Sequence, residues 1–405
     1  MRILFITGRY SYGDAKRGEA YEHQNFLPAL RRLGHDVEVL DSLQRSDYPS
    51  FIELNRAVLV KVEEWRPDLI FYVPAFYEIW TETWDIIRKC GTVATVNWAP
   101  DDSWKYSQSS RFTAKHFDAC ATTYRDKIAS YLHNGYDRVL ESQWAADASR
   151  LQHPLPASEC EYDVCFIGAN YGTRSKFIKA LMEVGIKVAC FGHGWPNGPI
   201  SGEKIAPTFL RSKISLNFSG SGKFIERYLP NRRQIKARVF EVPGAGGFLL
   251  GEWAPGIERF YELDTEIAVF HTEEELIEKV NNYLAHPDIR DACAIAAYQR
   301  TVREHTYDLR LNDIIQFAVK QHQKIPTGSG LIDWSVFAQA VSQHKVTPAL
   351  ALMRVALVKG CSIIYGKKRG PRAARRLVFE LSWRVFGEHT YSSKGLPGRL
   401  FYCES

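Results

Sequence analysis

Short runs of apolar residues recur along the first 125 residues and predict buried strands. The runs are RILFIT (2–7), DVEVL (36–40), DLIFYV (68–73), TVATVN (92–97) and FDACATT (117–123). Between the first two runs, four apolar residues recur at helical spacing and predict a helix that Gly34 ends. These four are Phe26, Leu27, Leu30 and Leu33. Alternation of strands with helices is typical of a parallel sheet covered on both faces.

The same alternation restarts after HPLPA (153–157), which we interpret as a linker. The strands predicted in this second half are YDVCFIG (162–168), IKVACFG (186–192), ISLNF (214–218), GGFLL (246–250) and EIAVF (266–270). Helices are predicted around 177–182 and over 272–288, and the second of these opens with an acidic first turn. IPTGSG (325–330) ends the second half.

This pattern predicts a two-lobed α/β protein, with one domain at 1–155 and a second at 156–325. In open α/β sheets, ligands bind at the carboxyl ends of the strands, so we expect a site in a cleft between the two halves. The 405 residues, 45% apolar and 24% charged, fit a soluble globular protein of about two domains with an extension.

The cysteines and the N-terminal residues indicate a cytoplasmic protein. The eight cysteines contain no CxxC pair and lie mostly in apolar segments, which predicts buried free thiols instead of disulfides or a zinc site. The first strand begins at the second residue, so no signal peptide is expected.

A basic helical extension is predicted over 331–405. It holds 12 Lys and Arg against 4 Asp and Glu, a balance of +8, while the first 330 residues hold 40 against 42, a balance of −2. One interpretation is purely structural: a packed helical appendage whose basic face is solvated. The alternative is peripheral contact of 345–387 with an anionic membrane, worth about 1 kcal/mol per basic residue near the surface. No recognisable nucleic-acid module is present, and no nucleic-acid partner is expected.

No membrane-spanning helix is expected from the apolar runs. The longest candidate, ALALMRVALV (349–358), is short and contains Arg354.

Glycines in the loop after the first strand indicate an open position for an acceptor or sugar. Gly8, Gly13 and Gly18 stand five apart, which does not form the GxGxxG pattern of a dinucleotide site. We assign Gly8 and Gly18 to acceptor binding. The alternative is a plain flexible connection.

NWAPDDSW (97–104) follows the fourth predicted strand and places two carboxylates between tryptophans. Asp101 or Asp102 is our candidate catalytic base or sugar-orienting group, because a carboxylate accepts hydroxyl hydrogen bonds. The faces of Trp98 and Trp104 would suit a sugar ring. The alternative is that one aspartate caps a helix. His23 is a further candidate on the acceptor side.

GANYGTRSK (168–176) opens the first helix of the second half. Backbone NH groups at a helix start, with Arg174 in the first turn, suit a diphosphate. Gly168 and Asn170 belong to the same predicted donor site. The alternative is a helix entrance with a solvated arginine.

RVFEVPGAGGFLLGEW (238–253) places Glu241 at the head of an uncharged, glycine-rich stretch. If 236–246 is a short helix before the strand, Glu241 could accept two ribose hydroxyls, and Arg238 could pair with it or with phosphate. Gly246 and Gly247 would let the backbone pass close to the donor phosphates. The alternative is that these glycines make a tight helix-to-strand turn. Asn217, in the strand predicted at 214–218, completes the donor set.

His305, in HTYDLR (305–310), begins the last helix of the second half. We expect this histidine to be a helix cap or a packed residue.

These motifs together resemble a known family. RVFEVPGAGGFLL, EIAVF, TEEELIEKVNNYLAHPDIR and HTYDLR resemble the glycosyl-transferase-like domain of the CgeB spore-maturation family, within the GT-B glycosyltransferases. KRGEAYEHQNFLPALRRLGHDVEVL resembles the first helix and strand of group-1 GT-B enzymes. The resemblance covers about residues 1–325 and is strongest from Asn217 to Arg310.

The resemblance implies the GT-B fold of two Rossmann-like domains facing a cleft. It also implies an acceptor-side first domain, a nucleotide-sugar-binding second domain and no obligatory metal. Glu241 matches the glutamate that holds the donor ribose, and Arg174 matches the basic residue on the diphosphate. Retaining group-1 enzymes carry another glutamate eight positions before the first, and here that position is Arg233. This departure leaves the anomeric outcome and the donor sugar open.

The expected function is therefore a cytoplasmic, bacterial glycosyltransferase of polysaccharide biosynthesis. The donor would be a nucleotide sugar, with a UDP-sugar as first choice and no other cofactor. The acceptor would be a hydroxyl of a glycan, a lipid-linked glycan or a protein. Two alternatives stay open. One is an inactive GT-B scaffold in surface-polysaccharide or coat assembly, which Arg233 favours, and the other is a sugar-nucleotide epimerase.

Overall fold

The computed structural model describes residues 1–220, 233–323 and 328–404. The chain divides into two compact units, one formed by Met1–Gln143 with Leu311–Ser405 and the other by Trp144–Arg310. The predicted ranges 1–155, 156–325 and 331–405 follow the order of the sequence, whereas contacts group the C-terminal residues with the N-terminal ones.

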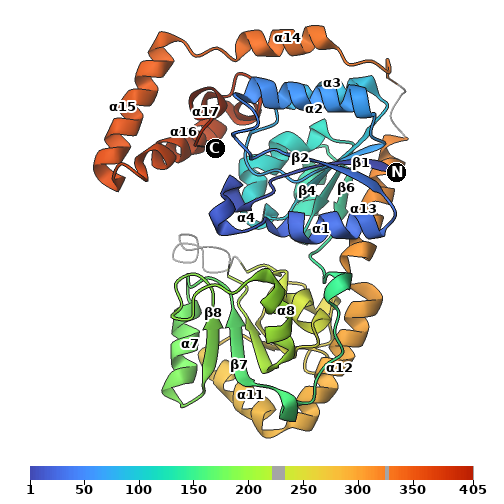
Figure 1. The fold of residues 1–405 in the computed structure, drawn as a ribbon, viewed down its shortest axis with the longest axis vertical. Helices are drawn as coiled ribbons and strands as arrows, with labels where there is room; N and C mark the ends of the chain where they lie inside the picture. Colours follow the sequence, from blue (N-terminus) through green and yellow to red (C-terminus); the bar gives the residue numbers. More distant parts are fainter. Residues whose placement is uncertain (221–232, 324–327, 405) are drawn as a thin grey trace. The chain divides into compact units, whose positions relative to one another are not determined.

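The first unit is built on a six-stranded parallel sheet with strand order β2-β1-β3-β4-β5-β6 (Figure 1). Its strands are β1 (Arg2–Thr7), β2 (Asp36–Asp41), β3 (Leu69–Tyr72), β4 (Ala94–Ala99), β5 (Ala119–Thr122) and β6 (Val139–Glu141). The five predicted strands are confirmed. The edge strand β6 was not predicted, because its three half-buried residues carry no apolar run.

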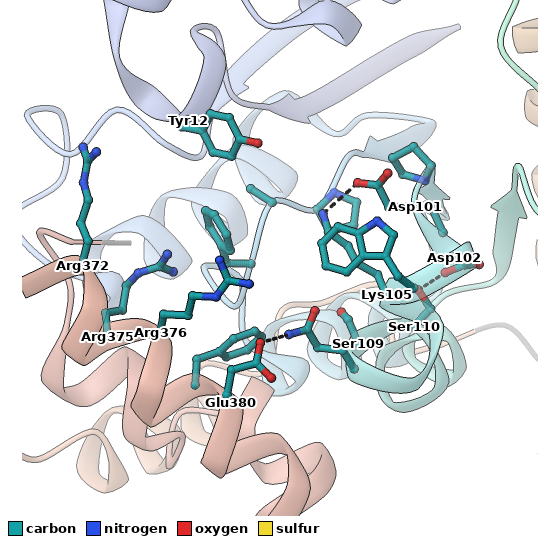
Figure 2. A pocket seen from close by; sticks show the side chains of 18 of the residues that line it. Tyr12, Asp101, Asp102, Lys105, Ser109, Ser110, Arg372, Arg375, Arg376 and Glu380 are labelled. Atoms are coloured by element: carbon teal, nitrogen blue, oxygen red, sulfur yellow. Dashed lines mark hydrogen bonds and ion pairs between the residues drawn. The ribbon is translucent and has the colours of Figure 1, made fainter. Parts of the chain in front are cut away.

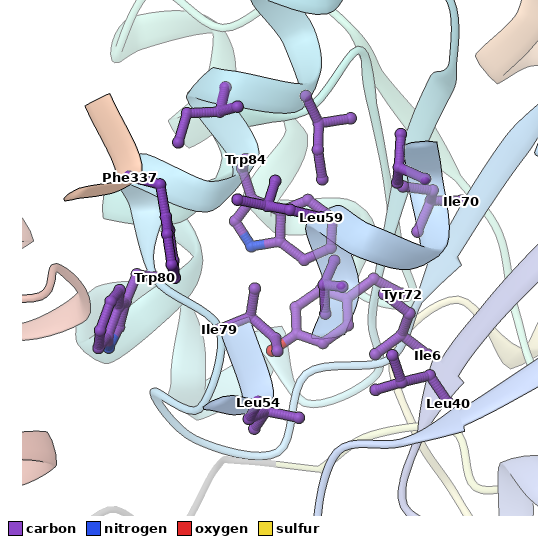
Figure 3. Packing of buried hydrophobic residues seen from close by; sticks show 14 of the residues in the cluster. Ile6, Leu40, Leu54, Leu59, Ile70, Tyr72, Ile79, Trp80, Trp84 and Phe337 are labelled. Carbon is purple, nitrogen blue, oxygen red and sulfur yellow. The ribbon is translucent and has the colours of Figure 1, made fainter. Parts of the chain in front are cut away.

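Helices cover this sheet. They are α1 (Tyr21–Arg32), α2 (Phe51–Trp65), α3 (Thr81–Cys90), α4 (Asp102–Lys105), α5 (Arg111–Thr113) and α6 (Ile128–His133). The Ser50 hydroxyl accepts from the Glu53 amide at the start of α2, and Gly91 ends α3 with a φ of 74°. Figure 3 shows the resulting core, in which Leu54 and Leu59 of α2 and Trp84 of α3 pack beside Ile70 and Tyr72 of β3.

The C-terminal helices belong to this unit from Leu311 onward. They are α13 (Tyr307–His322), α14 (Trp334–Gln343), α15 (Pro348–Tyr365), α16 (Gly370–Phe386) and α17 (Leu396–Leu400). The first turn of α13 therefore lies in the second unit. Phe337 of α14 stacks on Trp80, with ring centroids 6.3 Å apart, and Phe379 of α16 lies 5.5 Å from the ring of Tyr77. The extension 331–405 therefore contributes side chains to the apolar core of the first unit, and only part of this extension is an appendage.

Helix α15 differs from its neighbours, because none of its 18 residues is buried. Thr347 caps its start and Gly366, with a φ of 80°, ends it. Its mean hydropathy of 1.5 makes it long and apolar enough to cross a membrane by length and composition. The expectation of no such helix rested on the run 349–358 alone, which is too short, whereas the whole helix from Pro348 to Tyr365 meets the length and composition of a span.

The second unit holds a five-stranded parallel sheet with order β11-β10-β9-β7-β8. Its strands are β7 (Tyr162–Ile167), β8 (Val188–Phe191), β9 (Ser212–Asn217), β10 (Leu249–Glu252) and β11 (Ala268–Phe270). Its helices are α7 (Arg174–Glu183), α8 (Gly202–Leu210), α10 (Arg238–Gly244), α11 (Glu273–Ala285) and α12 (Pro287–Glu304). All five predicted strands and the short helix α10 are confirmed.

Both predicted boundary segments are packed against a unit. HPLPA (153–157) belongs to the second unit, where Arg290 Nη1 donates to the Leu155 carbonyl (2.9 Å). Of IPTGSG (325–330), residues 325–327 lie outside the described residues, and the Gly330 amide donates to the Cys90 carbonyl of the first unit (2.9 Å). The interpretation of HPLPA as a linker was therefore wrong, because its backbone is hydrogen-bonded to helix α12.

All eight cysteines are free thiols. Five of them are buried, as predicted, whereas Cys403 is exposed near the C-terminus.

Candidate functional site

Several of the predicted donor residues of the second unit lie at the carboxyl end of β7. The loop from Gly168 to Thr173 leaves this strand and leads into α7, whose first residue is Arg174. A Cβ on Gly168 would lie 2.8 Å from Phe166 Cζ and 3.3 Å from Arg174 Nη1, so a larger residue would crowd the Phe166 ring beside this guanidinium. Asn170 joins the loop to the next one, since its side-chain amide donates to the Gly194 carbonyl (3.3 Å).

Arg174 is held in place by the loop. It is 9% exposed, and it donates to the Ala169 carbonyl (2.8 Å) and the Tyr171 hydroxyl (2.7 Å). Its guanidinium also lies 3.8 Å from the centre of the Tyr171 ring. The alternative of a solvated arginine is wrong. The charge is fixed at the start of α7, where backbone NH groups and the helix dipole favour an anion.

Helix α10 brings Glu241 and Arg238 to the same strand end. Arg238 Nη1 forms an ion pair with Glu241 Oε2, and Arg238 Nε donates to the carbonyl of Ile167, the last residue of β7 (3.5 Å). The Glu241 side chain is 13% exposed, so it does not point freely into solvent. Glu241, Arg238 and the Gly168 loop therefore meet at one place.

The neighbouring strands add two polar side chains. Asn217 ends β9, which pairs with β7, and it is 4% exposed. Glu252 ends β10 and was not predicted. It accepts from the Ser219 amide (2.9 Å) and lies 3.3 Å from Arg233 Nη2. Glu252 could have been found from the sequence, because a carboxylate follows directly after the apolar run GGFLLG.

Arg233, the departure from the group-1 pattern, is therefore paired with a buried carboxylate.

Gly246 and Gly247 do not approach a ligand. Gly246 has a φ of 77°, and a Cβ there would lie 2.6 Å from the Gln152 carbonyl oxygen. A Cβ on Gly247 would lie 2.9 Å from the Phe209 carbonyl oxygen. Both glycines are buried and make room for neighbouring backbone of the same unit. Their assignment to the donor phosphates was wrong, and the alternative of a tight helix-to-strand turn is what the structure shows.

His305 is a packed residue. Its Nε2 donates to the Phe260 carbonyl (2.8 Å), its Nδ1 accepts from Arg310 Nη2 (3.0 Å), and burial lowers its pKa.

The first unit contains a pocket of about 340 Å³ at the carboxyl end of its sheet. Its walls come from the loops after β1, β3 and β4 and from helix α16 (Figure 2). The polar and aromatic residues that matter below are Tyr12, Arg17, Asp101, Trp104, Lys105 and the α16 arginines Arg372, Arg375 and Arg376.

The two aspartates of NWAPDDSW have different environments. Asp101 is half-buried on the pocket wall and lies 3.4 Å from Lys105 Nζ. Asp102 is fully buried and accepts from the hydroxyls of Ser110 (2.5 Å), Thr122 (2.6 Å) and Tyr131 (2.7 Å). Neither side chain caps a helix. Burial raises the pKa of Asp102, and the three hydroxyl donors act in the opposite direction.

The two predicted tryptophans also separate. Trp104 lines the pocket, with Lys105 Nζ 5.2 Å from the centre of its ring. Trp98 is 1% exposed in β4 and meets the Phe26 ring edge-on, 5.3 Å between centroids. The assignment of Trp98 to acceptor binding was wrong, because both faces of a central strand are buried.

Three further acceptor-side candidates are not among the residues that line the described pocket. Gly8 is buried, and a Cβ there would lie 2.6 Å from Leu43 Cδ1, so it serves packing. Gly18 is exposed and supplies a φ of 78° after a short turn. His23 Nδ1 lies 3.9 Å from Glu19 Oε1, and burial lowers the pKa of this histidine.

One carboxylate near this pocket was missed. Glu22 of α1 is half-buried, and burial raises its pKa, with the negative charge of Asp101 adding to the shift and the positive charge of Lys105 opposing it. Glu22 looks like an ordinary polar residue of a surface helix, so the sequence did not indicate that it lies near the pocket.

Across 1–220, 233–323 and 328–404, no three His, Cys, Asp or Glu side chains are placed to hold one metal ion.

Comparisons with known proteins agree with this layout. Residues 174–316, about a third of the chain, match a family described as glycosyl transferase-like. The matched range includes 221–232, which lies outside the described residues. No curated protein matches the chain. The match is to this broad family, and the narrower resemblance to the CgeB family stays a prediction.

Several solved structures share the fold. Sucrose-phosphate synthase from Thermosynechococcus elongatus has a TM-score of 0.55 at 10% identity, covering 78% of this chain and 98% of that chain. A glycosyltransferase from Rickettsia africae has a TM-score of 0.53 at 11% identity, covering 80% and 99%. An α-glucosyltransferase in complex with UDP and a 13-mer DNA containing an HMU base has a TM-score of 0.57 at 12% identity, covering 78% and 99%.

At these identities the likeness establishes the fold alone. The chain thus has the GT-B fold of glycosyltransferases, and its second unit carries most of the segment that matches the glycosyl transferase-like family.

Proposed function

We propose that this protein is a glycosyltransferase that moves a sugar from a nucleotide sugar to an acceptor hydroxyl. The observation that carries the proposal is the coincidence of the family match with the polar cluster at the end of β7. Arg174, Arg238 and Glu241 all lie within 174–316, and all three are held at the carboxyl end of β7. Ligands bind at that end of the strands in open α/β sheets.

The donor would lie with its diphosphate on the Gly168 loop and the start of α7. Negative charge grows on the diphosphate as the glycosidic bond breaks, and stabilising it is the main catalytic demand. Arg174 and the amides at the start of α7 would supply that stabilisation without a resident metal ion. Glu241 would accept two ribose hydroxyls, because its carboxylate is held in position by Arg238.

A UDP-sugar is the first choice of donor. Two solved structures with this fold and TM-scores above 0.5 were determined with UDP, one of them the α-glucosyltransferase and the other an Anabaena protein with UDP and glucose (TM-score 0.52, 12% identity, covering 80% of this chain and 100% of that chain).

The acceptor would bind in the pocket of the first unit. Trp104 offers an aromatic wall for a sugar ring, and Asp101 is the candidate base, since its carboxylate is half-buried and faces the pocket. Asp102 has both oxygens occupied by hydroxyl donors, so we assign it to holding the Asp101 loop.

The donor assignment is tested by isothermal titration with UDP-glucose and other UDP-, GDP- and dTDP-sugars. Replacement of Glu241 by alanine should weaken binding of the preferred donor at least tenfold, because hydrogen bonds to a charged group contribute roughly 1.5–3 kcal/mol. Arg174→Lys keeps the charge but loses the planar fork, and should weaken binding as well.

Glu203→Ala serves as a matched control, since Glu203 is an exposed glutamate of α8 in the same unit. Unchanged donor affinity in both site variants would overturn the assignment. If the wild type binds no nucleotide sugar at all, the scaffold alternative replaces the enzyme.

We also propose that the protein works at the inner face of a membrane, with α15 lying on the lipid surface. One side of α15 packs on α16 and α17 through Leu350, Leu357, Val358 and Cys361. The other side exposes Leu352 (72%) and Ile363 (87%), and Ile364 (74%) is exposed at the end of the helix. Such a helix supports peripheral binding, because its apolar side chains gain by leaving water.

The positive charge around α15 also supports contact of this helix with an anionic lipid surface. The stretch 345–387 holds ten Lys and Arg and a single carboxylate, Glu380. Lys367, Lys368 and Arg369 follow the exposed end of α15 and are themselves exposed. Arg354 donates to the Leu400 carbonyl (2.7 Å) and pairs with Glu404, so it stays on the packed side of the helix.

A further inference from the structure

The pocket of the first unit holds more positive charge than its own carboxylates neutralise. Each carboxylate on its wall already has another partner. Asp101 is paired with Lys105 (3.4 Å), Glu380 with Arg384 (2.5 Å) and Glu404 with Arg354. Asp102 is buried among three hydroxyls.

Helix α16 contributes three arginines to this wall. Arg372, Arg375 and Arg376 stand at i, i+3 and i+4, which places them on one face of the helix. Ala374 and Val378, both buried, anchor the helix to its neighbours. Figure 2 shows the three arginine side chains lining the pocket across from Asp101 and Lys105.

None of the three arginines forms an ion pair with a carboxylate in residues 1–220, 233–323 and 328–404. The Arg375 guanidinium lies 4.6 Å from the centre of the Phe76 ring, and its Nε is buried without a hydrogen-bond partner among the described residues. A buried donor without a partner is costly, and clustered guanidinium groups repel one another. An anion in the pocket would reduce the repulsion among the three guanidinium groups.

The chemistry of the walls identifies the anion. Guanidinium groups bind phosphate through two parallel hydrogen bonds, and several around one pocket favour a phosphoryl group over a single carboxylate. Arg17 and Lys105 also line the pocket but are paired with Asp14 and Asp101, so the unneutralised charge is that of the α16 arginines. Tyr12, Phe76 and Trp104 give aromatic surface. A volume of about 340 Å³ holds a ligand of the size of a phosphorylated monosaccharide.

We propose that this pocket binds a phosphoryl group, and that the glycosyl acceptor is accordingly a phosphate-bearing molecule. The statement about the acceptor rests on the proposed glycosyltransferase function, whereas the binding of phosphate does not. The phosphate could belong to a soluble sugar phosphate or to a lipid-linked one, and both would present the same group to Arg372, Arg375 and Arg376.

The test is isothermal titration of the full chain with inorganic phosphate and with glucose 1-phosphate, and with glucose as the uncharged control. Each titration is run with and without saturating UDP, so that phosphate binding at the donor site is separated from binding at the pocket. The Arg372→Ala/Arg376→Ala variant removes two exposed arginines and should bind both phosphates at least tenfold more weakly. Arg375→Gln should have a similar effect.

The matched control is Lys394→Ala, which removes an exposed charge of the same extension from a position outside both the pocket wall and the stretch 345–387. It should bind phosphate as the wild type does. Retention of wild-type phosphate affinity in the arginine variants would overturn the proposal, as would an absence of phosphate binding by the wild type.

Vesicles of phosphatidylcholine with and without phosphatidylglycerol distinguish the sources of phosphate. If the arginine variants lose vesicle binding and the wild type does not bind glucose 1-phosphate, the cluster recognises lipid headgroups and the pocket proposal is wrong. Loss of glucose 1-phosphate binding with unchanged vesicle binding supports it. Loss of UDP-sugar binding alone, with phosphate binding intact, would contradict the proposed function and leave the phosphate pocket standing.

Discussion

Adjacent residues of one motif have different roles because the sheet buries one and exposes the other. Asp101 lies on the wall of a pocket, while Asp102, one position later, is tied to three hydroxyls in the interior. The same contrast separates Trp104 from Trp98. From the sequence, these two aspartates and two tryptophans were all expected near one site. Which of them are buried could not be predicted, because that depends on where β4 ends.

Gly246 provides a residue-scale test of the helix-to-strand turn. We expect Gly246→Ala to lower the free energy of unfolding by about 2 kcal/mol or more, measured by urea denaturation. The new Cβ would be strained by the positive φ of 77° and would lie 2.6 Å from the Gln152 carbonyl oxygen.

Gly185→Ala is the matched control, because Gly185 has a φ of 85° but nothing within 4 Å of an added Cβ. Gly185→Ala should lower the free energy of unfolding by about 1 kcal/mol, which is the cost of backbone strain alone. Equal losses in the two variants would show that the Gln152 contact is unimportant. If a fully stable Gly246→Ala protein loses affinity for UDP-glucose, Gly246 belongs to the donor site after all.

At the scale of elements, buried strands were predicted well and packed helices less well. Strands of a parallel sheet are apolar along their whole length, so β1 and β7 stand out in the sequence. The edge strand β6 has no such run. The run within helix α15 was rejected as a span partly because it contains Arg354, a charge whose partner, the Leu400 carbonyl, is known only from the structure.

Helix α15 is also where the membrane proposal is tested. Leu352→Ser/Ile363→Ser should reduce flotation of the protein with phosphatidylglycerol vesicles by roughly tenfold or more, since each apolar side chain contributes about 1.5–3 kcal/mol when fully buried. Both side chains are exposed in the structure, so folding should be unaffected.

Met182→Ser is the control for this experiment, because Met182 is 59% exposed on the second unit. Point variants are preferable to a chain ending at Gln323, which would also remove Phe337 and Phe379 from the core of the first unit. Equal flotation of the wild type and the α15 variant would contradict membrane binding through this helix.

At the scale of the whole molecule, the least predictable feature is the return of the C-terminal residues to the first unit. The pocket combines Tyr12 and Asp101 with Arg375, residues that are far apart in the chain. Hydrophobic periodicity identifies elements but does not say which elements meet, so the arginines of α16 appeared only as part of a basic tail. The donor cluster was easier to predict, because its residues follow successive strands of one sheet.

A partly buried ion pair between His322 and Asp118 joins the two chain segments of the first unit. His322, the last residue of α13, places Nδ1 2.9 Å from Asp118 Oδ2, next to β5. Arg88 Nε lies 3.2 Å from the other Asp118 oxygen. The hydrogen bond to Asp118 raises the pKa of His322 against the effect of burial. Burial would raise the pKa of Asp118, but His322, the Thr95 amide and Arg88 together lower it.

The signs of these shifts define a pH window for the stability of the first unit. A histidine with a raised pKa contributes stability that is fully present below its unfolded pKa, about 6.5, and is lost as the pH rises through the folded value. An aspartate with a lowered pKa contributes stability that is present above its unfolded pKa, about 3.9, and is lost as the pH falls through the folded value. The pair should therefore stabilise the unit most strongly between about pH 5 and pH 6.

The prediction is that His322→Gln lowers the free energy of unfolding by about 1–2 kcal/mol at pH 5.5 and by clearly less at pH 9, measured by urea denaturation at both values. Comparison with the wild type at each pH cancels the titration of the other histidines. His133→Gln is the control, because His133 is an exposed histidine of the same unit, at the end of α6, and should show no such difference. A His322→Gln loss that is equal at both pH values would mean that His322 acts by packing and a neutral hydrogen bond, and that its charge does not hold α13 against β5.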